Sequence, residues 1–148
     1  MAKERVPKEI KLKKIRDGTV IDHVPAGKAL EVLRILGVGD KFPDVVAVLM
    51  NVESKRLGKK DVIKVENKEL SKEEADRLAL VAPNATINIV KDFGVKKKID
   101  VELPRELVGI VKCANPQCVT NREQVATRFS VVSTNPLEIR CEHCERTQ

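Results

Sequence analysis

The segment CANPQCVTNREQVATRFSVVSTNPLEIRCEHC, residues 113–144, contains all four cysteines of the 148-residue chain. Four residues separate Cys113 from Cys118, two separate Cys141 from Cys144, and twenty-two lie between the two pairs. Each pair is typical of a knuckle whose two thiolates bind one tetrahedral ion. The intervening VATRFSVVSTNPLEIR predicts two strands that bring the knuckles together. We therefore predict one structural zinc ion per chain, held by these four cysteines.

The metal is expected to be structural because four thiolates already complete a tetrahedral shell and leave no open position for catalysis. His143 lies between two of the cysteines. It could replace one of them, but we interpret it as an exposed knuckle residue because four thiolates are already available. A unit of about forty residues with few large apolar side chains needs the binding free energy of a metal in order to fold.

Disulfide bonds are the alternative use of four clustered cysteines. The N-terminal segment MAKERVPKEIKLKK has no apolar signal-like core, and the chain contains no apolar run long enough to span a membrane. We therefore expect a cytoplasmic protein without a membrane partner. In that reducing compartment metal thiolates are favoured over disulfides.

The remaining chain predicts a separate globular domain. Hydrophobic residues make up 42% of the sequence and charged residues 34%, which is enough apolar material for a core and too much for a disordered chain. Residues 1–112 contain no cysteine. With a boundary near Pro104, we predict one domain over residues 1–103 and a small zinc-ribbon-like β domain over residues 104–148.

The first half of the N-terminal domain predicts strands around one helix. IKLKKIRDGTVIDHV, residues 10–24, alternates on both sides of Arg16–Gly18 and predicts two short strands joined by a tight turn. GKALEVLRILG, residues 27–37, places apolar residues at helical spacing before a terminal glycine. DVVAVLMNV, residues 44–52, is almost continuously apolar and predicts a central strand covered on both faces.

The second half predicts a turn over residues 53–61, a strand over VIKVEN at 62–67, a second helix and a strand over ATINIVKD at 85–92. Ser71 and Glu74 have the spacing of a capping box, and Pro83 ends the helix that they open. A lysine run, Lys96–Lys98, follows Gly94, and VELPREL at 101–107 is interpreted as irregular. This order predicts an α+β fold in which two helices cover one face of a ferredoxin-like antiparallel sheet.

Catalysis is not expected from this chain. It contains no Walker loop, GxGxxG, HExxH or nucleophile elbow, and only His23 and His143 could exchange protons near neutral pH. Considered alone, Asp22–His23 would be a turn pair and GKKD at 58–61 a lysine-rich loop. The net charge of +6 is compatible with nucleic acid, nucleotides or a solvated lysine-rich surface.

A nucleic-acid-binding zinc ribbon is the alternative function, because basic zinc domains commonly contact phosphates. From Gly109 to Gln148, however, five basic side chains stand against four acidic ones. The chain contains no Tyr or Trp, so few aromatic side chains could stack on unpaired bases. We therefore do not expect a nucleic-acid partner.

Several segments resemble the regulatory chains of aspartate carbamoyltransferase. They are GTVIDHVPAG at 18–27, GKKDVIKVEN at 58–67, LSKEEADRLALVAPNATINIV at 70–90 and the two cysteine pairs. The resemblance implies a non-catalytic subunit with a nucleotide-binding allosteric domain and a zinc domain that docks on catalytic chains. It further implies regulatory homodimers that bridge catalytic trimers, with CTP, ATP and possibly UTP as the effectors that control pyrimidine biosynthesis.

The resemblance also implies an effector site. Asp22 would accept hydrogen bonds from ribose hydroxyls, His23 would lie close to phosphate, and Lys64 would reach ribose and base.

Two further positions match those that hold the triphosphate, namely Asn88 and Lys98. Lys98 is selected from the adjacent Lys96–Lys98 by its spacing from Asn88. Ile15 and Val20 would line the base pocket.

Overall fold

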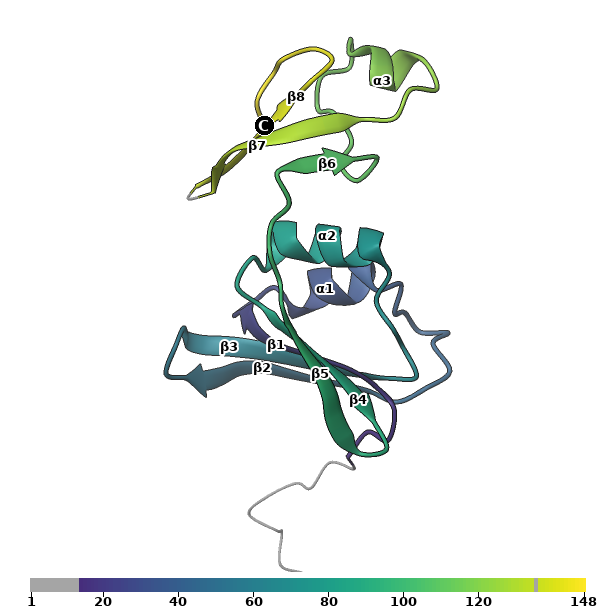
Figure 1. Cartoon of the computed structure of the whole chain (residues 1–148), viewed down its shortest axis with the longest axis vertical. Helices are drawn as coiled ribbons and strands as arrows, with labels where there is room; N and C mark the ends of the chain where they lie inside the picture. The colour runs from purple at the N-terminus through teal and green to yellow at the C-terminus, as the bar shows by residue number, and fades with distance from the viewer. Residues whose placement is uncertain (1–13, 135) are drawn as a thin grey trace, which may run out of the picture.

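The computed structural model describes residues 14–134 and 136–148, which form a five-stranded sheet with two helices followed by a three-stranded sheet (Figure 1). The first part runs through β1 (Gly18–Pro25), α1 (Ala29–Ile35), β2 (Val46–Ser54), β3 (Gly58–Glu66), α2 (Lys72–Val81), β4 (Thr86–Lys91) and β5 (Gly94–Asp100). The second part runs through β6 (Glu106–Val108), α3 (Val119–Arg122), β7 (Arg128–Thr134) and β8 (Leu137–Cys141).

The large sheet has the strand order β2-β3-β1-β4-β5, and every pairing is antiparallel. The element order β1-α1-β2-β3-α2-β4 with this strand order is the ferredoxin-like arrangement, so that prediction is confirmed. Both helices lie on one side of the sheet (Figure 1). Because side chains alternate along a strand, only every second residue of the central strands faces the helices.

The core of the first part lies between the helices and the inward row of the sheet. Ile21 of β1 pairs with Ile63 of β3 and with Ile87 of β4, and all three side chains are buried. The helices contribute Val32 and Leu78 to the same cluster, and both are fully buried. The residues one step away from this isoleucine row therefore lie on the sheet face opposite α1 and α2.

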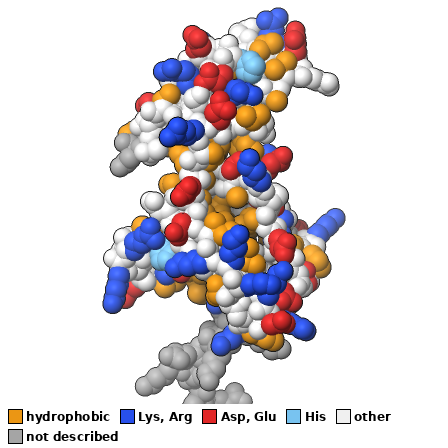
Figure 2. Space-filling view, in the orientation of Figure 1, with side chains coloured by type: hydrophobic (Ala, Val, Ile, Leu, Met, Phe, Trp, Pro, Cys, Tyr) orange, Lys and Arg blue, Asp and Glu red, His pale blue; other side chains and the backbone are white. Residues whose placement is uncertain are grey.

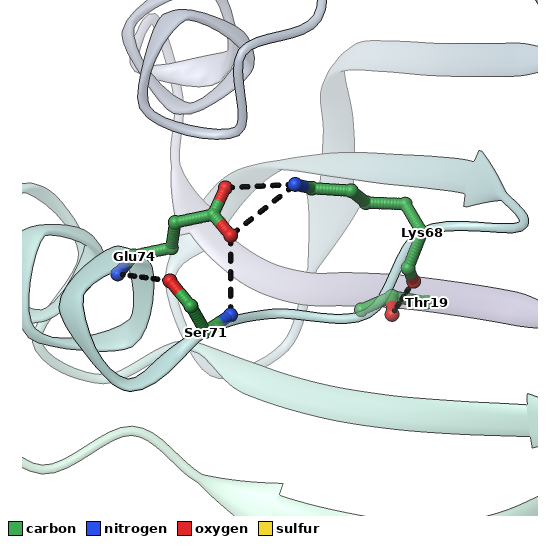
Figure 3. Close-up of polar contacts among 4 residues, drawn as sticks. All are labelled: Thr19, Lys68, Ser71 and Glu74. Atoms are coloured by element: carbon green, nitrogen blue, oxygen red, sulfur yellow. Dashed lines mark hydrogen bonds and ion pairs between the residues drawn. The ribbon is translucent and has the colours of Figure 1, made fainter.

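The capping box predicted for α2 is present. The backbone N–H of Glu74 donates to Ser71 Oγ over 3.2 Å, and that of Ser71 donates to Glu74 Oε1 over 3.1 Å (Figure 3). Lys68 Nζ lies 3.0 Å from Glu74 Oε2, which links the preceding loop to the first turn of the helix. The loop that enters α2 is thus held by hydrogen bonds and an ion pair.

Two strand predictions were wrong about the edges of this sheet. β2 is an edge strand, whereas its apolar sequence predicted a central one, and Leu49 and Met50 remain 39% and 44% exposed. The lysine run Lys96–Lys98, which is not predicted as a strand, lies in the opposite edge strand, β5. An edge strand rich in lysine is a common protection against unwanted pairing, and its exposed residues give no apolar alternation to detect.

The predicted hairpin at the start of the chain was wrong for residues 14 and 15, which form no strand, whereas Arg16 and Asp17, expected in its turn, form a bend. Its residues 10–13 lie outside the described residues. β1 pairs instead with β3 and β4, whose first residues, Gly58 and Thr86, come forty residues or more after Gly18. The turn predicted over residues 53–61 is also shorter than expected, since β2 continues to Ser54 and β3 begins at Gly58.

The second part has a three-stranded sheet in the order β6-β7-β8. The two strands predicted between the cysteine pairs are confirmed as the antiparallel β7 and β8. Phe129 and Leu107 are fully buried in the centre of its small core, and Leu80 of α2 packs against that core. The helix α2 therefore takes part in the packing of both cores, and Figure 1 shows it between the two sheets.

Candidate functional site

The four cysteines converge at one point of the C-terminal part. The Sγ atoms of Cys113, Cys118, Cys141 and Cys144 all lie within 4.8 Å of one another. Cys113 Sγ is 3.6 Å from Cys144 Sγ, and Cys118 Sγ is 3.8 Å from Cys141 Sγ. These separations are too long for disulfides, and all four cysteines are free.

The same separations fit a tetrahedral zinc site. With zinc–sulfur bonds of about 2.3 Å, the edge of a tetrahedron of sulfur atoms measures about 3.8 Å. Three of the thiols are buried, and His143 is exposed with its Nε2 3.2 Å from the Ala126 carbonyl oxygen. The four thiolates could therefore fill the coordination shell of one ion, with His143 directed elsewhere.

Hydrogen bonds around the cluster favour thiolates. The Thr120 hydroxyl donates to Cys118 Sγ over 3.2 Å and lowers the pKa of that thiol, assisted by the Thr120 backbone N–H. The backbone N–H of Arg146 lowers the pKa of Cys144 to about 6. Burial raises the pKa of Cys113 to about 12, so this thiol depends most on a cation for its ionisation.

Gln148 joins the two knuckles, which the sequence did not indicate. Its Oε1 accepts the Ala114 N–H over 2.8 Å, and its Nε2 donates to the Lys112 carbonyl over 3.1 Å. Its backbone also pairs with Ile139 in both directions. These contacts hold the residues on either side of Cys113 against β8.

Four of the predicted effector residues form one row across the other sheet. Val20 of β1 is the register partner of Lys64 in β3 and of Asn88 in β4, and Asn88 is the partner of Lys98 in β5. All four lie one step from the buried isoleucine row. They therefore belong to the sheet face opposite α1 and α2.

Asp22 and His23 lie beside this row, two and three residues after Val20 along β1. Asp22 pairs with Thr86, and His23 occupies a bulge of β1 with a φ of 57°, which a non-glycine residue seldom adopts. His23 Nδ1 is 3.2 Å from Thr86 Oγ1. Lys60 Nζ is 2.9 Å from Asp22 Oδ1. Thr86 and Lys60 were missed by sequence reasoning, since strand register alone brings them to this point.

The base-lining prediction involves the start of β1. Ile15 is buried, and its Cγ2 would lie 3.1 Å from a Cβ added to Gly18. Gly18 is two residues before Val20 on the same strand. The structure thus brings Ile15 to the row next to Val20.

The three adjacent lysines separate between the two faces of the sheet. Lys98 is opposite Asn88, whereas Lys97 is opposite Ile89, a residue of the helix-covered face. Lys96 and Lys97 both line a cavity on the helix side. Only Lys98 of the three shares a row with Val20 and Asn88.

The ion pair with Lys60 affects the ionisation of Asp22. Burial alone would raise the pKa of this carboxyl, but the hydrogen bonds from Lys60 and from the His23 N–H outweigh it, and the pKa lies below its usual value. The charged carboxylate is therefore favoured in the fold. Its contribution to stability is present above the pKa of the unfolded chain and is lost as the pH falls through the folded-state pKa.

Lys60→Ala is expected to raise the pKa of Asp22, because burial would then be opposed mainly by the His23 N–H. The measurement is an NMR titration of the Asp22 carboxyl carbon. Lys59→Ala, which changes the exposed neighbour, is the control and should leave the titration as in the wild type. An unchanged Asp22 titration in Lys60→Ala would contradict the role given to this ion pair.

Within residues 14–134 and 136–148, no helix combines the length and apolar character that crossing a membrane requires.

Two family models together match almost the whole chain. Residues 10–102 match the model described as aspartate carbamoyltransferase regulatory chain, allosteric domain. Residues 105–148 match the model described as the metal binding domain of the same chain. The second match covers all four clustered cysteines.

Individual relatives are similar over nearly their full length. The aspartate carbamoyltransferase regulatory chain of Thermococcus onnurineus is 53% identical over 139 residues, which cover 94% of this chain and 92% of the relative. That of Korarchaeum cryptofilum is 55% identical over 138 residues, covering 92% and 88%. That of Pyrococcus horikoshii is 54% identical over 141 residues, covering 94% and 92%.

Proposed function

Since the chain belongs to the family of aspartate carbamoyltransferase regulatory chains, we propose that its open sheet face binds nucleoside triphosphates and that its metal-binding domain docks on catalytic chains. The chain is a non-catalytic subunit of a pyrimidine-biosynthesis enzyme, with an allosteric and a metal-binding domain. We place the boundary between these domains at residues 103 and 104. The effectors and the docking are the parts that we propose.

The row from Lys64 through Val20 and Asn88 to Lys98 is the observation that supports nucleotide binding. A nucleotide requires cations for its phosphates, polar groups for its ribose and an apolar wall for its base. Lys98 and Asn88 at one end would hold the triphosphate. Lys64 at the other end would reach the ribose and base.

The remaining effector residues complete this arrangement. Asp22 would accept hydrogen bonds from the ribose hydroxyls, and His23 would donate to phosphate. Lys60, which contacts Asp22, would add a cation beside the same groups. Ile15 and Val20 would supply the apolar wall for the base. We propose CTP and ATP, and also UTP, as ligands of this one site.

Regulation requires more than binding. An effector changes activity only if it binds the two states of the assembly with different affinities, typically by about 1–3 kcal/mol. The contact of Leu80 with the core of the metal-binding domain offers a physical connection between the effector domain and the docking domain. We propose that this contact couples effector binding in the N-terminal domain to the state of the docking domain.

The metal-binding domain is proposed to hold one structural zinc through Cys113, Cys118, Cys141 and Cys144. This assignment rests on sulfur–sulfur separations of 3.6 and 3.8 Å, close to the edge of a zinc–thiolate tetrahedron. The ion would supply no chemistry to a substrate. Its contribution would be to fix the knuckles and so the surface that meets the catalytic chain.

A homodimer would use the apolar edge of the large sheet. β2 is an edge strand, and Val45, Leu49 and Met50 beside or within it are 61%, 39% and 44% exposed. An exposed apolar edge strand is a site at which another chain can add its own strand. We propose that β2 of a second copy pairs with this edge.

The proposed effector site is tested by comparing two adjacent lysines. Lys98→Ala is expected to weaken CTP and ATP binding about 10-fold or more, because a charge-assisted hydrogen bond to phosphate contributes about 1.5–3 kcal/mol. His23→Ala should weaken the same binding. Isothermal titration calorimetry of the zinc-loaded chain measures both.

Lys97→Ala is the matched control, since it removes an identical charge from the opposite face of β5. It should leave nucleotide affinity within about twofold of the wild type. Zinc content should be the same in all variants. If Lys98→Ala and His23→Ala bound nucleotide as the wild type does, the site would have to lie elsewhere.

A further inference from the structure

A cavity of about 480 Å³ opens on the helix-covered side of the N-terminal sheet, between the β4–β5 hairpin and the segment that leads into α2. Its volume lies within the range of small-molecule sites. Its apolar lining residues are Leu70, Ala75, Ile87, Ile89 and Ile99. Its charged lining residues are Lys72, Lys91, Lys96, Lys97 and Glu69.

This cavity is distinct from the proposed effector site. Ile87 and Ile89 alternate along β4 with Asn88, and Lys97 alternates along β5 with Lys98. The cavity and the effector row therefore use opposite faces of the same two strands. A ligand could occupy either one without displacing a ligand from the other.

The charge around the cavity favours an anion. Four lysines stand against one glutamate. Lys91 Nζ is 4.0 Å from Glu69, whereas Lys72, Lys96 and Lys97 form no ion pair within the described part of the chain. On the face drawn in Figure 2, hydrophobic side chains are exposed near the middle of the molecule between lysine and arginine side chains. An apolar body with an acidic group would satisfy both kinds of surface.

Contacts within the chain hold the segment beside the cavity in place. The buried Thr19 hydroxyl donates to the Lys68 carbonyl oxygen over 2.5 Å, and Lys68 in turn contacts Glu74 (Figure 3). Ser71 and Glu74 close the capping box of α2 next to these contacts. A site that is already formed loses little conformational entropy on binding.

We propose that this cavity binds a small amphipathic anion, with its apolar body on Ile87, Ile89 and Ile99 and its carboxylate, phosphate or sulfonate beside Lys96 and Lys97. Ala75 of α2 lines the same cavity, and the later residue Leu80 packs on the metal-binding domain. A bound ligand would thus contact α2, the helix that packs in the core of one domain and against the core of the other.

The test uses anilinonaphthalene sulfonate, a fluorescent probe with apolar rings and one sulfonate, and the zinc-loaded full-length chain. Saturable binding of one probe per chain is expected. In a chain with labelled isoleucine methyl groups, the resonances of Ile87, Ile89 and Ile99 should shift on titration. The resonance of Ile139, in the small core of the other domain, should not.

Two variants should weaken binding of the probe. Lys96→Ala combined with Lys97→Ala is expected to raise its Kd about three- to tenfold, as loss of charge contacts from two exposed lysines implies. Ile99→Asp puts a carboxylate into the apolar lining and should raise the Kd about tenfold or more. The double lysine variant keeps the test valid if Ile99→Asp is poorly folded.

Two controls should bind the probe as the wild type does. Lys98→Ala removes the neighbouring charge from the other sheet face, and Val132→Asp places the same carboxylate on an exposed position of β7. The affinity for ATP, measured on the same samples, should fall in Lys98→Ala and stay unchanged in the cavity variants. The cavity proposal and the effector-site proposal can therefore be refuted independently of each other.

Three results would overturn the proposal. The first is no saturable binding of the probe at millimolar concentration. The second is wild-type affinity in both Ile99→Asp and the double lysine variant. The third is binding that disappears in Leu49→Lys, which alters the exposed β2 edge, but persists in Ile99→Asp.

Discussion

Replacing Cys113 with serine is expected to unfold the metal-binding domain and to leave the nucleotide-binding domain folded. The four thiols are the only metal-ligand cluster found among the described residues, and the small core around Phe129 and Leu107 is too limited to hold this unit alone. Structural zinc sites contribute roughly 10–16 kcal/mol of apparent binding free energy, which is also folding free energy. The N-terminal part has its own core and contains no cysteine.

The measurements are zinc content, NMR spectra and two binding titrations. Cys113→Ser should lose its zinc and the dispersed resonances of residues after Pro104, and it should no longer assemble with catalytic chains. ATP should still bind with nearly wild-type affinity. Ala114→Ser is the matched control because it introduces the same residue one position away, at an exposed site. A folded, metal-free C-terminal domain in Cys113→Ser would contradict this prediction.

The same samples distinguish docking on a protein from binding of nucleic acid. Acidic and basic side chains are interspersed over the C-terminal part on the face drawn in Figure 2. We therefore expect the wild type to bind catalytic chains and not DNA or RNA at physiological salt. Strong binding to nucleic acid that falls steeply with salt, without binding to catalytic chains, would overturn the docking proposal.

The helices and inner strands could be predicted because their signals are local. Ser71, Glu74 and Pro83 specify both ends of α2 from within one short segment. In β3 the apolar Ile63 and Val65 lie on either side of Lys64, and in β4 Ile87 and Ile89 lie on either side of Asn88, which indicates the residues that face the core. The same alternation places Lys64 and Asn88 on the other face, as the structure shows.

The edges of the sheet could not be predicted because their signals depend on what lies beside them. The apolar β2 has the composition of a buried strand, yet among the described strands it has a neighbour on one side alone. The lysine-rich β5 carries no apolar alternation, and it becomes a strand only by pairing with β4. Neither property can be determined from the segment itself.

Long-range partners of the sites were missed for a related reason. Lys60 contacts Asp22 because the bulge in β1 shifts the register between Ile21 and Val24. Gln148 contacts residues on both sides of Cys113 because the chain returns along β8. Both contacts join residues that are far apart in the sequence, so local patterns do not predict them.

Asp61→Ala is expected to destabilise the N-terminal domain by about 3–5 kcal/mol. The carboxylate of Asp61 is fully buried and accepts three backbone N–H groups, from Gly27 over 2.9 Å, Ala29 over 3.1 Å and Asn51 over 2.9 Å. Alanine would leave these donors without an acceptor, and each unsatisfied buried group costs about 1–3 kcal/mol. Urea unfolding followed by circular dichroism measures the change, because the chain contains no Trp or Tyr for fluorescence.

Two comparisons separate this effect from the mere loss of a charge. Asp61→Asn keeps one acceptor oxygen and should lose less stability than Asp61→Ala. Asp40→Ala removes an exposed carboxylate that forms no hydrogen bond within the described part of the chain, and it should change stability by no more than about 0.5 kcal/mol. Equal stability of Asp61→Ala and Asp40→Ala would contradict the prediction.

The same substitution should also weaken nucleotide binding, although Asp61 does not belong to the proposed effector row. Asp61 pairs with Val24 directly after the bulge that carries His23, and its hydrogen bond to Asn51 holds the facing bulge of β2. Without the carboxylate the bulges of β1 and β2 are no longer supported by its hydrogen bonds. His23 should therefore sample more than one orientation. We expect Asp61→Ala to lower ATP affinity and to broaden the His23 ring resonances. The NMR spectra are recorded without urea, at a temperature at which the variant is folded. Sharp, wild-type His23 resonances in a destabilised Asp61→Ala would show that the bulge keeps its geometry without this support.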